Sequence, residues 1–420
     1  MATYYVDFVG GSDANAGTST GTAWKHSPGM AGATGTPAGT TPAAGDIFYF
    51  KKGVTWPATA LPLTIVWSGT SGNPITWFVT DWGTGNHAIF DAQSTDLYAI
   101  LSYSYSYNTL NGIDARNPAV QGTPPDDIYY YAIKFGGGGA LGLNITNCKT
   151  LNGSIFFSST GGSVKDCVVD FGNVSLGEAP AIEVMYSSNV VISGNDISNF
   201  TYCGIKTGGE GAENSSNVTV EKNFIHSPGS IPTSTVQAGI ILRDSTTCTY
   251  RYNVIDLHPA SAGGQYGMVS WNSGGSNKIY NNTIVMNGTG DGFQTSAQSG
   301  NIFRNNIVYN PGVGYDLLSG TGDVDYGTVY SATTEKTGTW TWGANNLTSD
   351  PTFVDVTFDA VADFQLQAAS PMIGAGVAYD SYHDGVNTDY WGTTTPQGAS
   401  PDIGAHEVAG AGPLTLIIGG

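Results

Sequence analysis

One short pattern of apolar and polar positions recurs along the middle of the chain. An apolar residue is followed after two spacers by Asn or Cys, and after one more spacer by a residue that is usually β-branched. Intervals of 19, 28, 28, 30, 29 and 24 residues separate its successive Asn or Cys positions, which are Cys148, Cys167, Asn195, Asn223, Asn253, Asn282 and Asn306. Repeat units that stack through their strands tolerate different lengths, because the extra residues lie in the loops. The pattern therefore predicts a β-solenoid.

The composition favours strands and tight turns throughout. Only 11% of the 420 residues are charged, against about 25% in ordinary globular domains, while 59 residues are glycine. Helices rely on charged amphipathic stripes, whereas strands and turns use the small and polar residues that abound here. A solenoid grows by adding coils, so we expect one elongated all-β body.

Phrases near both ends resemble right-handed parallel β-helix proteins of the pectate-lyase-like superfamily. They are residues 45–53 (GDIFYFKKG), 68–77 (SGTSGNPITW), 349–355 (SDPTFVD), 363–376 (DFQLQAASPMIGAG) and 401–407 (PDIGAHE). The resemblance implies a right-handed single-stranded parallel β-helix. It also implies a function among those of polysaccharide lyases, hydrolases, epimerases, phage tailspikes and non-catalytic adhesins, and fold alone does not choose between them.

Three regions follow from where the repeat begins and fades. We expect an N-terminal cap with the first strands in residues 1–60, the parallel β-helix in 61–310, and an irregular C-terminal extension in 311–420 with a hairpin, loops and a terminal apolar strand, Leu414 to Ile418. An apolar strand at a terminus invites pairing, so this strand is a candidate for homo-oligomer formation or virion attachment.

The charge balance restricts the partners. The formal net charge of −19 repels nucleic acid and anionic membranes, and no apolar run reaches the roughly 20 residues of a transmembrane helix. No signal peptide is visible at the N-terminus. We expect an extracellular protein that binds a polysaccharide, either secreted or carried on a virion.

Cysteines occupy two successive positions of the repeat. Cys148 and Cys167 would lie about 4.8 Å apart, close enough for stacked thiols or for a disulfide. We interpret them as reduced thiols that replace Asn.

A second set of strands carries the candidate chemistry. If the strands are aligned by their first residues, one outward column contains Lys134, Glu183, Lys206, Arg243, Trp271 and Gln294. The column is either a ladder of ion pairs or a binding face, which two loops, residues 208–216 and 226–239, would turn into a groove for a linear polymer.

These residue types suit β-elimination of a uronate polymer. Lys206 is the candidate base, with a pKa lowered by Arg243, and Arg243 would bind the substrate carboxylate. Glu183, with Glu210 or Glu213, would hold Ca²⁺. The alternating run from Leu101 predicts a strand with Tyr103, Tyr105 and Tyr107 on one face, either as packing or as a stacking platform for sugars.

Two alternatives stay open. A hydrolase would need two facing carboxylates, such as Asp244 with Glu183 or Glu213, but the acidic motifs of the polygalacturonase-like branch are absent. The Arg-x-Pro-x-x-Arg motif of the main pectate-lyase branch is also absent. The face around Lys206 and Arg243 favours a polysaccharide lyase, and a non-catalytic, glycan-binding, tailspike-like protein is the alternative.

Overall fold

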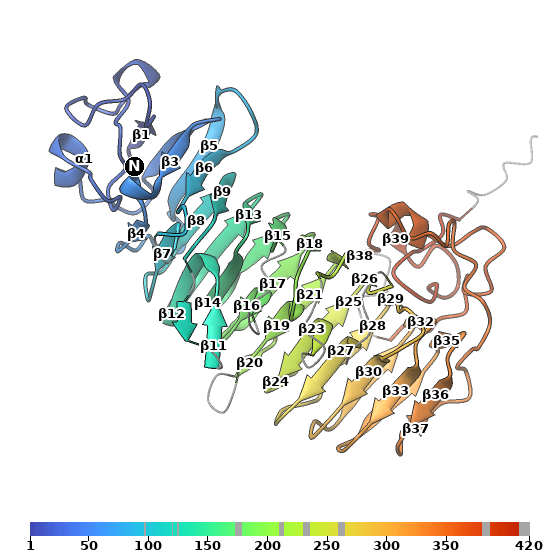
Figure 1. Ribbon diagram of the computed structural model, residues 1–420. Coiled ribbons are helices and arrows are strands. Elements are labelled where there is room, and N and C mark those ends of the chain that lie inside the picture. The colour runs from blue at the N-terminus through green and yellow to red at the C-terminus, as the bar shows by residue number, and fades with distance from the viewer. Residues whose placement is uncertain are drawn as a thin grey trace, which may run out of the picture.

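The computed structural model describes residues 1–95, 98–119, 121–123, 126–172, 179–209, 214–229, 236–258, 265–379 and 387–410. In these residues the chain winds into an elongated stack of parallel strands that runs from β1 to β37 (Figure 1). The coils present three faces, which we call face 1, face 2 and face 3. The predicted all-β parallel β-helix is confirmed.

Face 1 carries the second set of strands identified in the sequence. Its strands pair in parallel from coil to coil: β4 (Leu63–Ile65), β7 (Ile100–Ser102), the first part of β12 (Tyr131–Thr146), the first part of β14 (Ser154–Lys165), β16 (Pro180–Val184), β19 (Cys203–Thr207), β23 (Gln237–Arg243), β27 (Gln265–Trp271), β30 (Asp291–Thr295), β33 (Val313–Leu317) and β36 (Thr334–Thr337).

Face 2 follows face 1 along each coil, and the bent strands β12 and β14 run from one face into the other. Its strands are β1 (Thr3–Val6), β2 (Ile47–Lys52), β5 (Ile75–Gly83), β8 (Asn108–Asn111), the ends of β12 and β14, β17 (Ser188–Ser193), β21 (Thr219–Glu221), β25 (Thr249–Arg251), β28 (Lys278–Tyr280), β31 (Asn301–Arg304), β34 (Gly322–Asp325) and β37 (Thr341–Trp342), with the short strands β20 (Ser215–Ser216) and β24 (Ser245–Thr246) beside them.

Face 3 is a separate parallel sheet. It contains β3 (Thr55–Pro57), β6 (Ala88–Asp91), β9 (Ile113–Arg116), β13 (Lys149–Leu151), β15 (Val168–Asp170), β18 (Asp196–Ser198), β22 (Phe224–His226), β26 (Val254–Asp256), β29 (Thr283–Val285), β32 (Ile307–Tyr309) and β35 (Thr328–Tyr330).

Outside the coils, the described residues form two small antiparallel pairs and a few helical turns. The pairs are β10 (Gln121–Thr123) with β11 (Asp126–Tyr129), and β38 (Asn387–Thr388) with β39 (Thr394–Thr395). The helical turns are α1 (Gly35–Gly39) and the 3₁₀ turns Thr20–Thr22, Ala58–Ala60 and Val361–Phe364. None of the helices in these described parts has the length and hydropathy needed to span a membrane.

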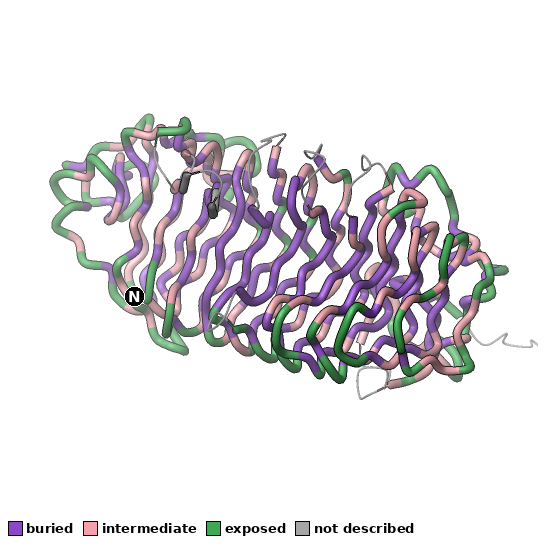
Figure 2. The backbone as a smooth tube through the Cα atoms, turned by 60° about the horizontal axis from the view of Figure 1, so that its bottom comes forward, coloured by how far each residue is buried: buried purple, intermediate pink, exposed green. Residues whose placement is uncertain are grey.

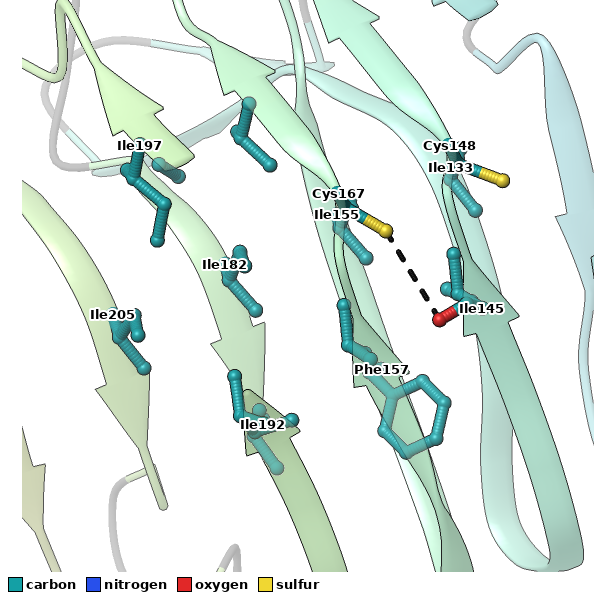
Figure 3. Close-up of a cluster of buried hydrophobic side chains, with 14 of the residues drawn as sticks. Ile133, Ile145, Cys148, Ile155, Phe157, Cys167, Ile182, Ile192, Ile197 and Ile205 are labelled. Atoms are coloured by element: carbon teal, nitrogen blue, oxygen red, sulfur yellow. Dashed lines mark hydrogen bonds between the residues drawn. The ribbon is translucent and has the colours of Figure 1, made fainter. Parts of the chain in front are cut away.

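Alternate side chains of every coil fill the interior between the faces. Figure 2 shows the buried residues running along the length of the tube, and Figure 3 shows how isoleucines of successive coils stack, with Cys148 and Cys167 in line with them. Both cysteines are fully buried thiols, as predicted. Burial of aliphatic side chains contributes about 25 cal/mol per Å² of apolar surface, which makes this core the main source of stability.

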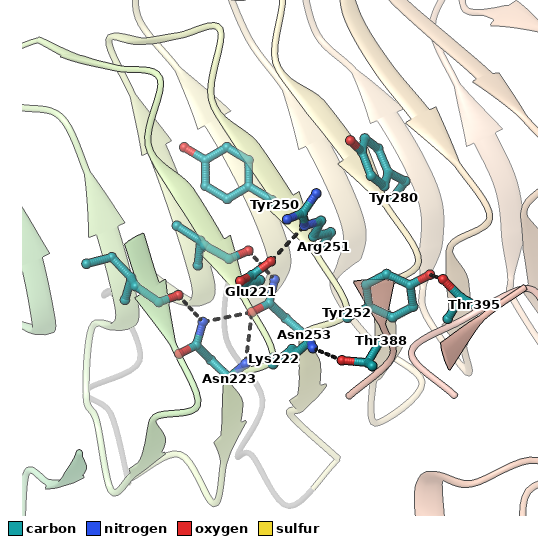
Figure 4. A network of polar contacts seen from close by, with 12 residues as sticks. Glu221, Lys222, Asn223, Tyr250, Arg251, Tyr252, Asn253, Tyr280, Thr388 and Thr395 are labelled. Atoms are coloured by element: carbon teal, nitrogen blue, oxygen red, sulfur yellow. Dashed lines mark hydrogen bonds and ion pairs between the residues drawn. The ribbon is translucent and has the colours of Figure 1, made fainter. Parts of the chain in front are cut away.

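The asparagine ladder lies at the corner between face 2 and face 3. Asn223 donates from its backbone N and its Nδ2 to the Oδ1 of Asn253, at 3.1 and 2.9 Å, and its Nδ2 also donates to the carbonyl of Ile192 (Figure 4). The same arrangement links Asn195 to Asn223 and Asn253 to Asn282. These amides are buried, so their bonds satisfy the polar groups of the turn and hold each coil in register with the next.

A column of glycines lies at the start of the face 1 strands. A Cβ built on Gly267 would lie 2.5 Å from the carbonyl O of Gly292 and 2.5 Å from Cγ2 of Ile284, on face 3. Gly204, Gly239 and Gly292 are similarly crowded by a backbone oxygen and a β-branched side chain. At this corner the coil is therefore narrow enough to exclude any side chain.

The parallel stack extends on both sides of the expected range 61–310. At the N-terminus β1 already pairs with β2, and the buried Trp24, stacked on Tyr4 at 4.5 Å, covers the open end of the first coil. After residue 310 the strands β33 to β37 continue the coils in place of the predicted hairpin, because their inward Tyr315 and Val324 still fill the core. The predicted terminal strand 414–418 lies outside the described residues.

The C-terminal extension covers the outer surface of face 3. Val254, Val285 and Ile307 point outward from that face and are fully buried against a cluster that includes Phe353 and Phe364. Polar contacts add to this docking, since Nζ of Lys222 donates to Oγ1 of Thr388 at 2.6 Å (Figure 4).

Buried carboxylates organise the end of the extension. Glu407 accepts hydrogen bonds from the backbone N–H groups of Gln397 and Asp402, at 2.6 and 3.0 Å, and it is 1% exposed. Burial, with the nearby charges of Asp402 and Asp389, raises the pKa of Glu407 to about 7. Burial also lowers the pKa of the adjacent His406 to about 4.

Replacing Gly267 by Ala should destabilise the helix. The added Cβ forces the backbone of the next coil to shift, at a cost of about 1 to 3 kcal/mol in the free energy of unfolding. Gly138→Ala is the matched control, because a Cβ there meets no atom within 4 Å. Urea denaturation of both variants provides the measurement, and equal midpoints would contradict the crowding argument.

Replacing Glu407 by Gln should change how stability depends on pH. Because the folded-state pKa of Glu407 is raised from 4.5 to about 7, its contribution is fully present below about pH 4.5 and is lost as the pH rises through about 7. The unfolding free energy of the wild type minus that of Glu407→Gln should therefore fall across this window, measured by urea titration at each pH. A difference that stays constant or rises would show that Glu407 does not titrate in this way.

Candidate functional site

The outward side chains of face 1 form a column whose register the strand pairing defines. Side chains alternate along each strand, so one side chain per coil enters this outward column, and successive members lie about 4.8 Å apart. The column contains Lys134, Phe156, Glu183, Lys206, Ile241, Val269, Gln294 and Asp316. Four of the six residues predicted for it are therefore present.

Arg243 and Trp271 lie outside this column, which corrects the prediction. They pair with each other two residues further along β23 and β27, at the next outward position of each strand. Ile241 is the direct neighbour of Lys206. Arg243 is thus a diagonal neighbour of Lys206, at the roughly 7 to 8 Å typical of such positions.

Glu183 and Lys206 form an ion pair that is buried on the outward face. Nζ of Lys206 lies 2.8 Å from Oε1 of Glu183, and Glu183 is 0% exposed. The other carboxylate oxygen accepts a hydrogen bond from the hydroxyl of Tyr131. The ion-pair interpretation of the sequence is therefore correct for these two residues, but the pair is desolvated, and removing one partner would leave a buried charge.

Lys134 is enclosed by aromatic rings beside this pair. Its Nζ lies 5.4 to 5.9 Å from four ring centroids, those of Tyr98, Tyr103, Tyr131 and Phe156. Burial lowers the pKa of Lys134, and the charge of Glu183 opposes part of this effect. Burial thus shifts the protonation equilibrium of Lys134 toward the neutral amine.

A group of acidic and aromatic residues lies further along face 1. Nε2 of Gln294 donates to Oδ2 of Asp291 at 3.0 Å and to Oδ2 of Asp316 at 3.2 Å. Trp271 donates to Oε1 of the same amide at 3.4 Å, and the ring of Tyr266 lies 6.2 Å from that of Trp271. Burial, with the charge of Asp316, raises the pKa of Asp291 to about 6.

The predicted tyrosine strand is wrong. β7 ends at Ser102 and β8 begins at Asn108, so Tyr103, Tyr105 and Tyr107 lie in the turn between face 1 and face 2. Tyr107 has a positive φ of 54°, which interrupts a strand whatever its alternation pattern. Tyr103 is 50% exposed and flanks Lys134, whereas Tyr105 is half-buried.

Calcium fits the described residues poorly. Both oxygens of Glu183 already accept hydrogen bonds, and across the described ranges no three His, Cys, Asp or Glu side chains converge on a point. Glu210 and Glu213 lie outside the described residues, as do parts of the two predicted groove loops. Calcium binding stays a prediction.

The predicted hydrolase residue Asp244 has a structural role. It is 2% exposed and accepts hydrogen bonds from the backbone N and the hydroxyl of Ser273 and from Nδ2 of Asn272. These bonds link two successive turns and use both of its oxygens.

Several residues of the site carried a weak signal in the sequence. Tyr131 faces the cluster because the register shifts between Tyr131 and Ile133, and such a bulge re-aims a side chain. Asp316 lies in a part of the chain where the ladder motif has faded. Asp291 directly precedes Gly292 of the glycine column, and an alignment that starts at the glycine leaves it out.

Comparison with known proteins bears on the fold. The family model described as the right-handed beta helix region matches residues 126–284 and 212–348. The solved structure of pectate lyase Pel9A is 17% identical, with a TM-score of 0.60, and the match covers 97% of this chain and 96% of that chain. This likeness confirms the predicted resemblance at the level of fold.

Two further solved structures are similar at lower scores. The GH136 lacto-N-biosidase from Eubacterium ramulus has 15% identity and a TM-score of 0.49 over 82% of this chain and 67% of that chain. A rhamnogalacturonan lyase has 13% identity and a TM-score of 0.46 over 94% and 99%. No curated protein sequence matches the chain.

The two matches of the family model overlap and together span residues 126–348, more than half of the chain. The same span holds the asparagine ladder and the column on face 1. The chain belongs to the right-handed β-helix family.

Proposed function

We propose that the protein cleaves an acidic polysaccharide by β-elimination on face 1. The observation that carries the proposal is the enclosed Lys134 beside the buried ion pair of Glu183 and Lys206. The overall likeness to pectate lyase Pel9A agrees with it.

Lys134 takes the role of base that the sequence analysis assigned to Lys206. A neutral amine accepts a proton, and burial lowers the pKa of Lys134. Lys206 instead donates a hydrogen bond to Glu183. With Arg243 diagonal to it, Lys206 places positive charge where the carboxylate of a uronate would bind.

In the proposed step, Nζ of Lys134 removes the proton at C5, beside the carboxylate of the uronate. The electron pair forms the double bond between C4 and C5, the bond from C4 to the glycosidic oxygen breaks, and that oxygen takes a proton from water. Negative charge develops on the carboxylate during the step, and the cation of Lys206 stabilises it.

Replacing Lys134 by Met should abolish lyase activity. Loss of a general base lowers kcat by about 100-fold to 10,000-fold. The assay follows the ultraviolet absorbance of unsaturated uronates with polygalacturonate, alginate and hyaluronate as substrates, and Lys149→Met on face 3 is the control. In the wild type the rising limb of kcat/KM with pH should lie below 10.5, the ordinary pKa of lysine.

Two results would contradict this proposal. One is an absence of unsaturated product from every polymer in the panel, and the other is unchanged activity in Lys134→Met. Binding of these polymers without cleavage would instead support the non-catalytic, tailspike-like alternative.

Glycoside hydrolysis is a second candidate, favoured by the carboxylates of Asp291 and Asp316. One amide nitrogen contacts both, so their nearest oxygens lie within about 6 Å, close to the separation in retaining glycosidases. The raised pKa of Asp291 suits a general acid, and Asp316 would act as the nucleophile. Trp271 and Tyr266 supply rings on which a sugar would stack.

If this second activity exists, Asp291→Asn should lower the release of reducing ends from neutral polysaccharides by about 100-fold or more. Wild-type activity should fall as the pH rises through about 6, because the acid must be protonated. Asp359→Asn, at an exposed position of the extension, is the control. Equal rates for both variants would remove Asp291 from the mechanism.

A further inference from the structure

Three aromatic side chains form a row on the outer surface of face 2 at its N-terminal end. Tyr5 of β1, Tyr49 of β2 and Phe78 of β5 are in register, and their ring centroids are 5.5 and 5.7 Å apart. All three are half-buried, although they point away from the core. No residue of this row belongs to the site on face 1.

Trp82 turns this row into a pocket. The end of β5 brings its indole ring within 5.8 Å of Tyr5, edge to face, although these residues lie two coils apart. With Val79 and Asp81, the four rings line an open cavity of about 480 Å³. This volume is within the range of small-molecule sites, about 300 to 1,000 Å³.

The charges around the pocket are balanced. Nζ of Lys51 lies 2.7 Å from Oδ2 of Asp7, and Nζ of Lys52 lies 2.7 Å from Oδ1 of Asp81. Each lysine therefore has a carboxylate partner at hydrogen-bond distance. A neutral ligand suits this pocket better than a uronate, which would require an uncompensated cation.

We propose that this pocket is a second carbohydrate site, which binds a neutral pyranose of a glycan chain. The apolar C–H faces of a pyranose stack on aromatic rings. The hydroxyls around its edge form hydrogen bonds. The rings of Tyr5, Tyr49 and Trp82 provide the stacking surfaces, and the ion pair of Lys52 and Asp81 provides a donor and an acceptor at the rim. The inference does not depend on the activity proposed for face 1, since the two surfaces lie on different faces.

Replacing Trp82 by Ala should weaken binding of neutral oligosaccharides by about tenfold or more, because a stacking contact is worth roughly 1.4 kcal/mol. Titration calorimetry with cellopentaose, xylopentaose and mannopentaose measures it, with trigalacturonate as the charged comparison. Asp81→Asn, at a fully exposed side chain, tests the rim with little risk to folding and should also weaken binding. Tyr186→Ala, at a 45% exposed aromatic elsewhere, is the matched control.

The inference is supported if the wild type binds at least one neutral oligosaccharide and both pocket variants bind it more weakly, while Tyr186→Ala binds normally. It is overturned if no neutral oligosaccharide binds, or if the pocket variants bind as the wild type does. It is also overturned if light scattering shows that Trp82→Ala converts a wild-type dimer into a monomer, because the rings would then pack against a second copy. Cleavage by face 1 should be unchanged in Trp82→Ala, so failure here and failure of the lyase proposal give different results.

Discussion

The register of the central coils depends on the buried asparagine amides, from Asn195 to Asn306, at the corner between face 2 and face 3. Each Oδ1 accepts both a backbone N–H and a side-chain N–H from the preceding coil, and each Nδ2 bonds a backbone carbonyl. A slip of one residue would leave these groups unpaired in the interior, at a cost of about 1 to 3 kcal/mol for each. Since the same register aligns the strands of face 1, the placement of Glu183 beside Lys206 depends on it too.

The sequence predicts this repetitive part well because the ladder motif marks each coil. It also predicts that Lys134, Glu183, Lys206 and Gln294 share a column, since each lies two residues after an Ala or Gly at the aligned start of its strand. Arg243 and Trp271 were misplaced because they occupy the next outward position of their strands, and alternation alone does not distinguish two outward positions. The enclosure of Lys134 was not predictable, because its rings come from three different coils and one of them, Tyr131, is turned outward by a bulge.

The three faces differ in what they leave open. The extension covers face 3 between β26 and β32 with an apolar cluster, so that part of the surface is closed to a ligand. Face 1 carries the buried ion pair of Glu183 and Lys206, and the N-terminal end of face 2 carries aromatic rings beside two ion pairs. The two proposed sites on this scaffold therefore differ, since one relies on charged groups and the other on stacking.

The glycine column has a consequence for how such a protein changes in length. Each glycine from Gly204 to Gly292 lies against the backbone of the next coil and a β-branched residue on face 3, so the two positions form one steric unit. A deletion within the strands of a coil would separate a glycine from its partner and place a side chain where none fits, whereas the loops absorb differences in length. Stable variants that lose or gain strands should therefore differ by whole coils, and the proposed polymer-binding surface would lengthen or shorten in steps of about 4.8 Å.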